Sequence, residues 1–253
     1  MLNIKPVPGL PEVQPGDDLA LLIGEAMRRA RLQLRAGDVL VIAQKIVSKT
    51  EGRIVELATV EPGAEAARLA AECDKDPRLV ELVLRESTEV LRTVPGVIIV
   101  EHRLGLVLAN AGIDQSNLRP GDDHGYALLL PEHPDASAAN LREALAARFG
   151  IEDLGVIIND SVGRAWRLGT VGLAIGVAGM TALWDLQGDR DLFGRELQVS
   201  ETGIADQVAS AAQIVQGEGN EGTPVVRVRG LARLGPAQTA RDLLRPRDQD
   251  LFR

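Results

Sequence analysis

Two apolar runs of the sequence each lead into a short group of polar residues. Residues 155–158 are followed by Asp160 and Ser161, and residues 104–109 are followed by Asp114. In α/β proteins, binding and catalytic side chains commonly follow the ends of strands. A carboxylate beside a hydroxyl is a usual way to hold Mg²⁺ or Mn²⁺ next to a phosphate. Each group alone is also typical of a surface turn, but together they favour a shared metal–phosphate site.

A glycine-rich segment, Gly-Glu-Gly-Asn-Glu-Gly at 217–222, has the spacing of a dinucleotide-binding loop. Such a loop needs a strand before the glycines and a helix after them. Here the predicted order is helix, glycines, strand, which argues against a Rossmann fold. The loop is compatible with a plain helix-to-strand turn. Its backbone N–H groups could also cradle a phosphate, and Glu218 and Glu221 suit a phosphate that arrives with a divalent metal.

Lysine is scarce in this chain, and two lysines fall close together. Only four of the 28 basic residues are Lys, and Lys45 and Lys49 both lie in the segment 44–53. The two side chains share one face if this segment is helical. A lysine is a compact point charge that suits a phosphate, and Arg164 and Arg167 could clamp a phosphate or carboxylate. No Walker A sequence is present, so a P-loop fold is not expected.

Strand-like and helix-like segments alternate along the chain, which predicts an α/β or α+β fold. Asp18, Asp76 and Gly150 are typical of helix caps. The glycines within 169–179 predict a close approach of backbones, and 118–137 is the expected long loop. His102 and Glu86 are expected to be solvated. The predicted helices cover 19–34, 62–73, 77–91, 138–149 and 204–215. The predicted strands cover 38–43, 97–100, 104–109, 154–158, 197–201 and 224–228.

Composition excludes several classes of protein. The 253 residues carry a net charge of −8, so the chain has no overall basic surface for nucleic acid or an acidic membrane. Aromatic residues make up only 2%, which disfavours base-stacking platforms. A single cysteine rules out internal disulfides and cysteine-cluster zinc sites. No membrane-length apolar run or signal peptide is visible, so we expect a cytoplasmic protein without nucleic-acid or membrane partners.

Taken together, the segments resemble the coenzyme F420-0:L-glutamate ligase (F420 gamma-glutamyl ligase) family in its single-domain form. They also resemble the N-terminal ligase domain of the two-domain actinobacterial version. The resemblance implies one domain over 1–253, with two interleaved subdomains (1–100 with 180–253, and 101–179) as a finer division. The implied fold is a mixed-sheet α/β (α+β) fold of that family's own type, neither Rossmann nor P-loop. The matching segments are 9–19, 37–53, 103–117, 155–179, 191–197 and 216–224.

The resemblance implies a GTP-dependent ligase. It would add L-glutamate to coenzyme F420-0, and further gamma-linked glutamates to F420-1, through an acyl phosphate with release of GDP and phosphate. The implied cofactors are two Mg²⁺ or Mn²⁺ ions, with K⁺ as a further candidate, and the implied assembly is a homodimer. Two alternatives remain open at this point: a metal-dependent GTP phosphohydrolase and a non-catalytic nucleotide-binding module.

The resemblance also implies roles for individual residues. Lys49, with Arg164, would assist phosphoryl transfer. The implied metal ligands are Asp114, Asp160, Ser161 and Glu218. The residues implied to contact GTP are Leu10, Pro11, Glu12, Val13, Gln44, Lys45, Lys49, Asn117, Gln216, Gly217, Glu218, Gly219, Asn220, Glu221, Gly222 and Thr223.

Overall fold

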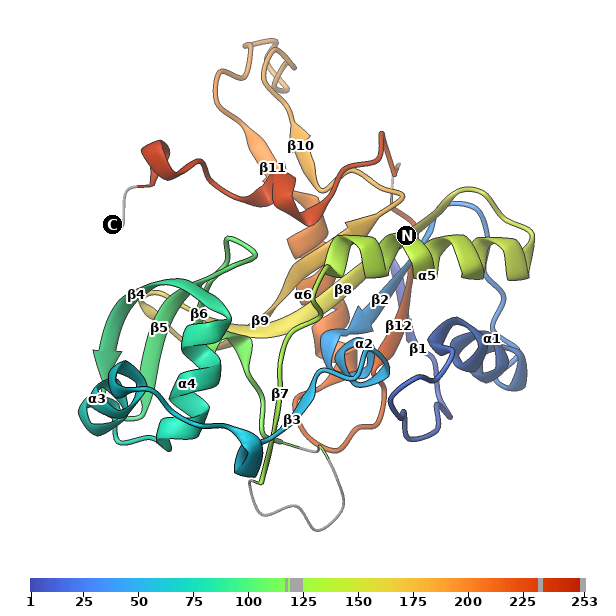
Figure 1. Cartoon of the computed structure of the whole chain (residues 1–253). Coiled ribbons are helices and arrows are strands. Elements are labelled where there is room, and N and C mark those ends of the chain that lie inside the picture. The colour runs from blue at the N-terminus through green and yellow to red at the C-terminus, as the bar shows by residue number, and fades with distance from the viewer. Residues whose placement is uncertain (117, 119–124, 232–233, 251–253) are drawn as a thin grey trace.

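The centre of the computed structural model is a mixed five-stranded sheet (Figure 1). The structure describes residues 1–116, 118, 125–231 and 234–250. The strand order is β1-β12-β2-β8-β9. The pair β2–β8 is parallel, and the other neighbours are antiparallel. The bounds are β1 (Asn3–Pro6), β12 (Val225–Arg229), β2 (Asp38–Ala43), β8 (Leu154–Arg164) and β9 (Arg167–Ala178).

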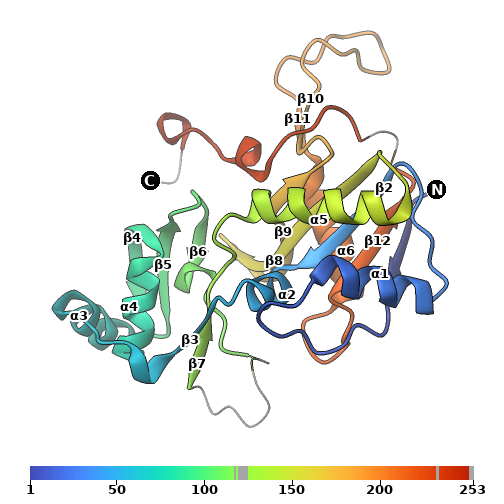
Figure 2. The ribbon, with the colours of Figure 1, turned by 45° about the vertical axis from the view of Figure 1, so that its right-hand side comes forward.

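Helices cover both faces of this sheet (Figure 2). On one face, α1 (Leu19–Arg29) and α5 (Pro134–Phe149) share a core with Leu40 and Ile42 of β2. On the other face, α6 (Ile204–Gln216) shares a core with Val39 and Val41. Alternate residues of β2 therefore point to opposite layers, and the strand is apolar after Asp38 because both of its faces are buried.

A second, smaller body lies to one side of the central sheet (Figures 1 and 2). It has its own apolar core, which includes Cys73, Val80 and Ile98. The smaller body comprises α3 (Ala64–Cys73), α4 (Pro77–Arg85), β4 (Ser87–Val94), β5 (Val97–His102) and β6 (Val107–Ala109).

A separate hairpin projects from the sheet and carries β10 and β11 (Figure 1). The remaining elements are α2 (Gln44–Thr50), β3 (Ile54–Glu56), β7 (Tyr126–Leu128), β10 (Leu183–Asp185), β11 (Glu201–Gly203), and the 3₁₀ turns η1 (Leu57–Thr59), η2 (Asn110–Gly112), η3 (Ala240–Leu243) and η4 (Arg247–Gln249).

Most elements predicted from sequence are confirmed, together with their caps. The carboxylates of Asp18 and Asp76 accept hydrogen bonds from the first turns of α1 and α4, and Gly150 ends α5 at φ 64°. The mixed sheet confirms the α/β class. The order α6, glycines, β12 confirms that the glycine-rich segment is not a Rossmann loop. Within the described residues, no helix has the length and apolar character needed to cross a membrane. The subdomain boundaries stay a prediction.

Other element predictions are wrong. The helix expected over 77–91 ends at Arg85, because β4 begins at Ser87 and pairs with β5. The loop expected over 118–137 contains β7 and the first turn of α5. The strand expected over 197–201 is β11 at 201–203, where pairing with β10 is available. The strand expected over 154–158 continues to Arg164, because β9 pairs with it beyond the end of β2.

The close backbone approach expected in the glycine-rich segment 169–179 is confirmed. A Cβ atom at Gly172 would lie 2.6 Å from the carbonyl oxygen of Ala209 on α6. A Cβ atom at Gly176 would lie 2.4 Å from the carbonyl oxygen of Pro134 on α5. Only glycine lets α5 and α6 pack this tightly against the two faces of β9.

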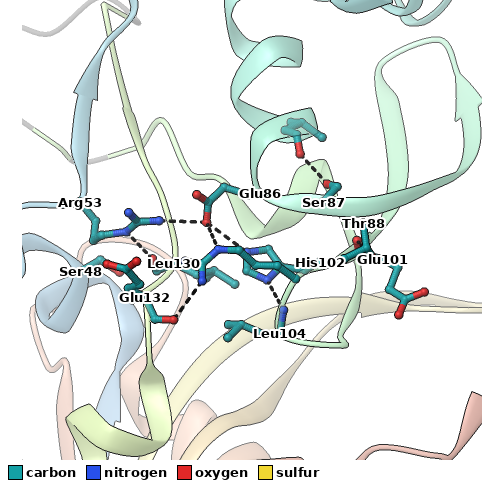
Figure 3. A network of polar contacts seen from close by, with 12 residues as sticks. Ser48, Arg53, Glu86, Ser87, Thr88, Glu101, His102, Leu104, Leu130 and Glu132 are labelled. Carbon is teal, nitrogen blue, oxygen red and sulfur yellow. Dashed lines mark hydrogen bonds and ion pairs between the residues drawn. The ribbon is translucent and has the colours of Figure 1, made fainter.

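Glu86 and His102, which we expected to be solvated, are buried in a charged cluster between the two bodies (Figure 3). The Glu86 carboxylate accepts hydrogen bonds from Arg53 Nη2 at 2.9 Å and Arg103 Nε at 3.0 Å. His102 Nδ1 accepts a hydrogen bond from the Leu104 N–H, so its proton lies on Nε2, which faces Glu86 at 3.5 Å. That distance is longer than either arginine contact.

This cluster stabilises the fold only while Glu86 is ionised. Burial alone would raise the pKa of the Glu86 carboxyl, but the His102 ring and the Arg53 and Arg103 charges more than offset it and lower the pKa to about 2. An acid whose pKa is depressed in the folded state stabilises the protein above its unfolded pKa and loses that contribution as the pH falls.

We expect Glu86→Gln to lower the free energy of unfolding near pH 7 by on the order of 3 kcal/mol, because two arginine charges lose a buried partner. Urea unfolding at pH 7 and at pH 3 measures this. The difference in the free energy of unfolding between wild type and variant should be smaller at pH 3. The exposed pair Glu65–Arg68 provides the control: Glu65→Gln should leave the free energy of unfolding nearly unchanged. Equal effects of the two substitutions would contradict the assignment.

Candidate functional site

A cavity of about 590 Å³ lies at the carboxyl end of β2, beside the middle of β8. We call it the strand-end cavity. Its walls come from α2, from η2 and the residues after it, from β8 and from the loop after α6. Lysines and carboxylates both line it, which suits a ligand that combines phosphates with cations. Its polar lining includes Gln44, Lys45, Lys49, Lys75, Asn110, Asp114, Gln115, Ser116, Asn159, Asp160, Ser161, Thr170, Gln213, Gln216, Glu218 and Thr223.

Asp114 is held at the cavity wall by the backbone and by Lys45. Its N–H and C=O groups form a bridge with Leu128, at 3.0 and 2.8 Å. Lys45 Nζ lies 2.7 Å from Asp114 Oδ2 and also donates to Ser116. Burial acts to raise the pKa of the Asp114 carboxyl, but the hydrogen bond and charge of Lys45 outweigh it, and the pKa is lowered. Asp114 is therefore ionised at neutral pH.

Asp160 and Ser161 are successive residues of β8, just past a register shift that follows Ile158. They lie within the strand, whereas the sequence predicted them beyond its end. Burial raises the pKa of the Asp160 carboxyl to about 7, and the negative charges of Asp114 and Glu218 add to the rise. The three carboxylates thus repel one another inside one cavity, and a bound cation would relieve that repulsion.

Lys49 lies on the same side of α2 as Lys45 and is 8% exposed. Burial lowers the pKa of the Lys49 ammonium, while the charges of Glu12 and Asp114 act in the opposite direction. The helical spacing of the two lysines, predicted from sequence, is confirmed. Because both side chains reach the strand-end cavity, they can bring two positive charges to an anionic ligand there.

The glycine loop, residues 217–222, continues directly from α6 into the cavity wall. Gly217 has φ 74°, and a Cβ there would collide with the Glu221 carboxylate. That carboxylate accepts a hydrogen bond from the Gly219 N–H at 2.9 Å, and Thr223 Oγ1 donates to the Val215 carbonyl at 2.8 Å. Glu218 is held by Thr170 Oγ1 at 2.9 Å. The loop is therefore fixed by its own polar side chains.

Gln213 of α6, which the sequence analysis missed, connects two of the implied metal ligands. Its Nε2 donates to Ser161 Oγ at 2.6 Å and to Glu218 Oε1 at 2.7 Å. Its Oε1 accepts from Asn159 Nδ2, which also donates to Gln216 Oε1 at 2.7 Å. Gln213 lies within α6 (Ile204–Gln216) as an ordinary polar helix residue, so no sequence pattern identifies it as part of a site. Gln213 aligns the hydroxyl and the carboxylate for a common ligand.

We expect Gln213→Ala to lower turnover by about 10- to 100-fold. It should also raise the metal concentration needed for half-maximal turnover, because residues behind metal ligands orient them. Steady-state rates over a Mn²⁺ titration measure this. Gln207→Ala, at an exposed position of the same helix, is the matched control and should leave both values unchanged. A Gln213→Ala enzyme with wild-type metal dependence would contradict the positioning role.

Other implied site residues lie apart from the cavity. Within 10–13, none lines it, although the Glu12 charge acts on Lys49. Arg164 is exposed at the tip of the β8–β9 hairpin, where Nη1 donates to the Gly169 carbonyl at 3.2 Å. Asn117 lies outside the described residues.

Most of the implied site residues do line the cavity. They are Gln44, Lys45, Lys49, Asp114, Asp160, Ser161, Gln216, Gly217, Glu218, Gly219, Gly222 and Thr223; Asn220 and Glu221 belong to the adjoining loop. Lys75, Asn110 and Thr170 also line it and were not predicted.

The donor set fits hard divalent cations. Carboxylate and hydroxyl oxygens surround the cavity, and these are the ligands that Mg²⁺ and Mn²⁺ prefer. In the described part of the chain, no three His, Cys, Asp or Glu side chains converge on one point to hold an ion by themselves. This arrangement suits Mg²⁺, which usually takes one or two carboxylates and completes its shell with substrate phosphates and water.

Comparison with known proteins agrees with these features. The F420-0:Gamma-glutamyl ligase family matches residues 9–230. The chain is 47% identical to the coenzyme F420:L-glutamate ligase of Methanopyrus kandleri, covering 100% of this chain and 98% of the relative. It is 45% identical to that of Methanothermobacter thermautotrophicus, with 98% and 97% covered. It is 41% identical to that of Archaeoglobus fulgidus, with 100% and 96% covered. The chain therefore belongs to the F420-0:gamma-glutamyl ligase family.

Proposed function

We propose that this chain is a coenzyme F420-0:L-glutamate ligase, which forms an amide bond between F420-0 and L-glutamate at the expense of GTP. Full-length similarity to proteins of that name supports the activity. The observation that carries the proposal is the strand-end cavity, where three carboxylates, a hydroxyl, the α2 lysines and the glycine loop meet. Further gamma-linked glutamates, on F420-1, would be added at the same cavity.

The reaction that fits this cavity activates a carboxylate by phosphoryl transfer. The terminal carboxylate of F420-0 attacks the γ-phosphorus of GTP, which gives an acyl phosphate and GDP. The α-amine of glutamate then attacks the acyl carbon, phosphate leaves, and the amine loses a proton. Both steps use nucleophiles of the substrates, so the protein needs none of its own.

The chain's own residues bind and orient the reactants. Lys45 and Lys49 would contact the GTP phosphates, and the glycine loop would wrap them with backbone N–H groups. Asp114, Asp160, Ser161 and Glu218 would hold two Mg²⁺ or Mn²⁺ ions. When bound, these ions neutralise the negative charge that develops on the phosphates. A K⁺ site and the roles of Arg164, Asn117 and residues 10–13 stay predictions.

A ligase and a phosphohydrolase differ in which substrates GTP turnover requires. A ligase releases GDP at a substantial rate only when F420-0 and glutamate are both present, because water is a poor substitute for the bound carboxylate. We would measure GDP release with each substrate omitted in turn. GDP release at the full rate from GTP and metal alone would favour the hydrolase, and tight GTP binding without any turnover would favour a non-catalytic module.

We also propose that the protein is a homodimer. The projecting hairpin carries Leu192, Phe193 and Val199, which are 99%, 95% and 85% exposed in one chain. Exposed apolar side chains that gather on one projection are typical of contact surfaces. Light scattering should give about 54 kDa, twice the 27.0 kDa of one chain, and Phe193→Asp should shift the mass towards that of one chain, since a charge would be buried. A wild-type mass near 27 kDa at micromolar concentration would contradict the dimer.

A further inference from the structure

A second cavity, of about 360 Å³, lies at the opposite end of the central sheet and is lined by cations. We call it the basic cavity. Five basic side chains contribute to its walls, and among the described residues no Asp or Glu does. In a chain with a net charge of −8, this is a local concentration of positive charge. Its lining is Asn3, Lys5, Arg31, Leu32, Gln33, Arg35, Arg227 and Arg229.

Strand register explains why these residues meet. Arg227 and Arg229 are two residues apart on β12, so they point to one face of the sheet. Lys5 and Asn3 of β1 are their cross-strand partners. The segment that follows α1 passes beside this face and brings Arg31 and Arg35. Arg31 has φ 53°, a left-handed conformation that turns the chain just after the helix ends.

The basic cavity is separate from the strand-end cavity. Arg229 pairs with Asp38, the first residue of β2, whereas the strand-end cavity begins at Ala43, its last residue. Six extended residues span roughly 20 Å. Figure 2 shows α1 beside β12 and β1. A ligand of the basic cavity therefore does not reach the proposed catalytic residues.

Arg227 is a buried cation in the wall of the basic cavity. It is only 5% exposed, yet no carboxylate contacts it among the described residues. Its Nη2 donates to Asn3 Oδ1 at 2.7 Å and its Nη1 to the Gln33 carbonyl at 3.5 Å, while its Nε has no acceptor within the part of the chain that the structure describes. Asp38 is already paired by Arg229, through contacts of 2.6 Å to both carboxylate oxygens. Burial lowers the pKa of the Arg227 guanidinium, and the charges of Arg229 and Arg35 lower it further, while the charge of Asp38 acts in the opposite direction.

We propose that the basic cavity is a binding site for a small polyphosphate anion. An anion there would give Arg227 the direct contact with a negative charge that no carboxylate of the described residues makes. Guanidinium groups match phosphate oxygens in geometry as well as in charge, because each offers parallel N–H donors. The cavity is several times larger than the space of about 30 Å³ that one water occupies, so it has room for more than one phosphate group. Several unpaired cations also favour a diphosphate over a singly charged anion.

The test is calorimetric titration of the full-length protein with inorganic diphosphate, in EDTA so that no divalent metal takes part. We expect wild type to bind, and Arg31→Ala/Arg35→Ala to bind at least about 10-fold more weakly, since two charge-assisted contacts are removed. Both arginines are exposed, so the variant should fold. Arg28→Ala, an exposed arginine of α1 outside the cavity, is the matched control and should bind as wild type does.

A second variant separates this site from the proposed catalytic one. Lys49→Met weakens any binding of diphosphate in the strand-end cavity, so binding that persists in this variant and is weakened by Arg31→Ala/Arg35→Ala belongs to the basic cavity. The same titrations with GDP identify the source of the phosphate: weakening of both ligands by Arg31→Ala/Arg35→Ala indicates a nucleotide, and weakening of diphosphate alone indicates the free anion. The proposal is overturned if wild type binds no diphosphate, if the double variant binds it equally well, or if Lys49→Met abolishes binding.

Discussion

Asp160→Asn is expected to lower ligase turnover by at least about 100-fold, because it removes a proposed metal ligand from the strand-end cavity. The substitution keeps the shape of the side chain. Since the pKa of Asp160 is raised to about 7, the neutral form is already well tolerated by its surroundings. The variant should therefore fold, and its defect should appear as weaker Mn²⁺ binding in calorimetry together with the loss of turnover.

A matched substitution keeps this prediction specific. Asp153 is exposed at the start of the same strand and lies outside the cavity. Asp153→Asn makes the same chemical change and should leave turnover and Mn²⁺ affinity at the wild-type values. If Asp160→Asn retained normal turnover and metal affinity, Asp160 would not be a metal ligand, and the two-ion arrangement would have to be abandoned.

Lys49→Met should also lower turnover by on the order of 100-fold, as expected when a positive group that stabilises developing phosphate charge is removed. The effect should fall mainly on the rate rather than on folding. Lys49 is buried and its pKa is lowered by that burial, so an apolar side chain of similar length relieves a desolvation cost. We therefore expect thermal unfolding at or above the wild-type temperature.

Two further variants define what Lys49 contributes. Lys49→Arg keeps the charge and should recover part of the lost rate, whereas Lys45→Met should chiefly release Asp114 from its ion pair and alter metal affinity. Turnover and GTP affinity for the three variants distinguish these roles. Wild-type turnover in Lys49→Met would remove it from the catalytic group, and a lowered unfolding temperature would indicate a structural role instead.

Regular elements with strong local signals can be predicted from this sequence. The strand 38–43 is a continuous apolar, β-branched run, and α4 begins at an Asp–Pro pair that caps it. The failures arise where pairing with distant segments decides the outcome. Helix α4 ends at Arg85 because the residues that follow form β4, which pairs with β5. Strand β8 continues past Ile158 because β9 pairs with it there. Neither partner can be identified from the local sequence.

The site follows the same division. Asp114, Asp160, Ser161 and the glycine loop are marked by polar residues after apolar runs, and the structure brings them to one cavity. Gln213 and Lys75 carry no such mark, because each sits in or beside a helix of ordinary composition. Gln213 belongs to the site through the packing of α6 against the central sheet, and Lys75 because the α3–α4 connection lies beside the same cavity. Burial of Glu86 likewise depends on arginines far away in sequence.

The most direct test of the central claim is the mass of the product. F420-0 is incubated with the protein, GTP, Mn²⁺ and L-glutamate, and the coenzyme is analysed by mass spectrometry. We predict that its mass increases by one glutamyl residue, or by several on longer incubation, and that omitting GTP prevents the gain. A coenzyme of unchanged mass, with the protein folded and GTP and metal present, would contradict the assignment of this chain as the ligase.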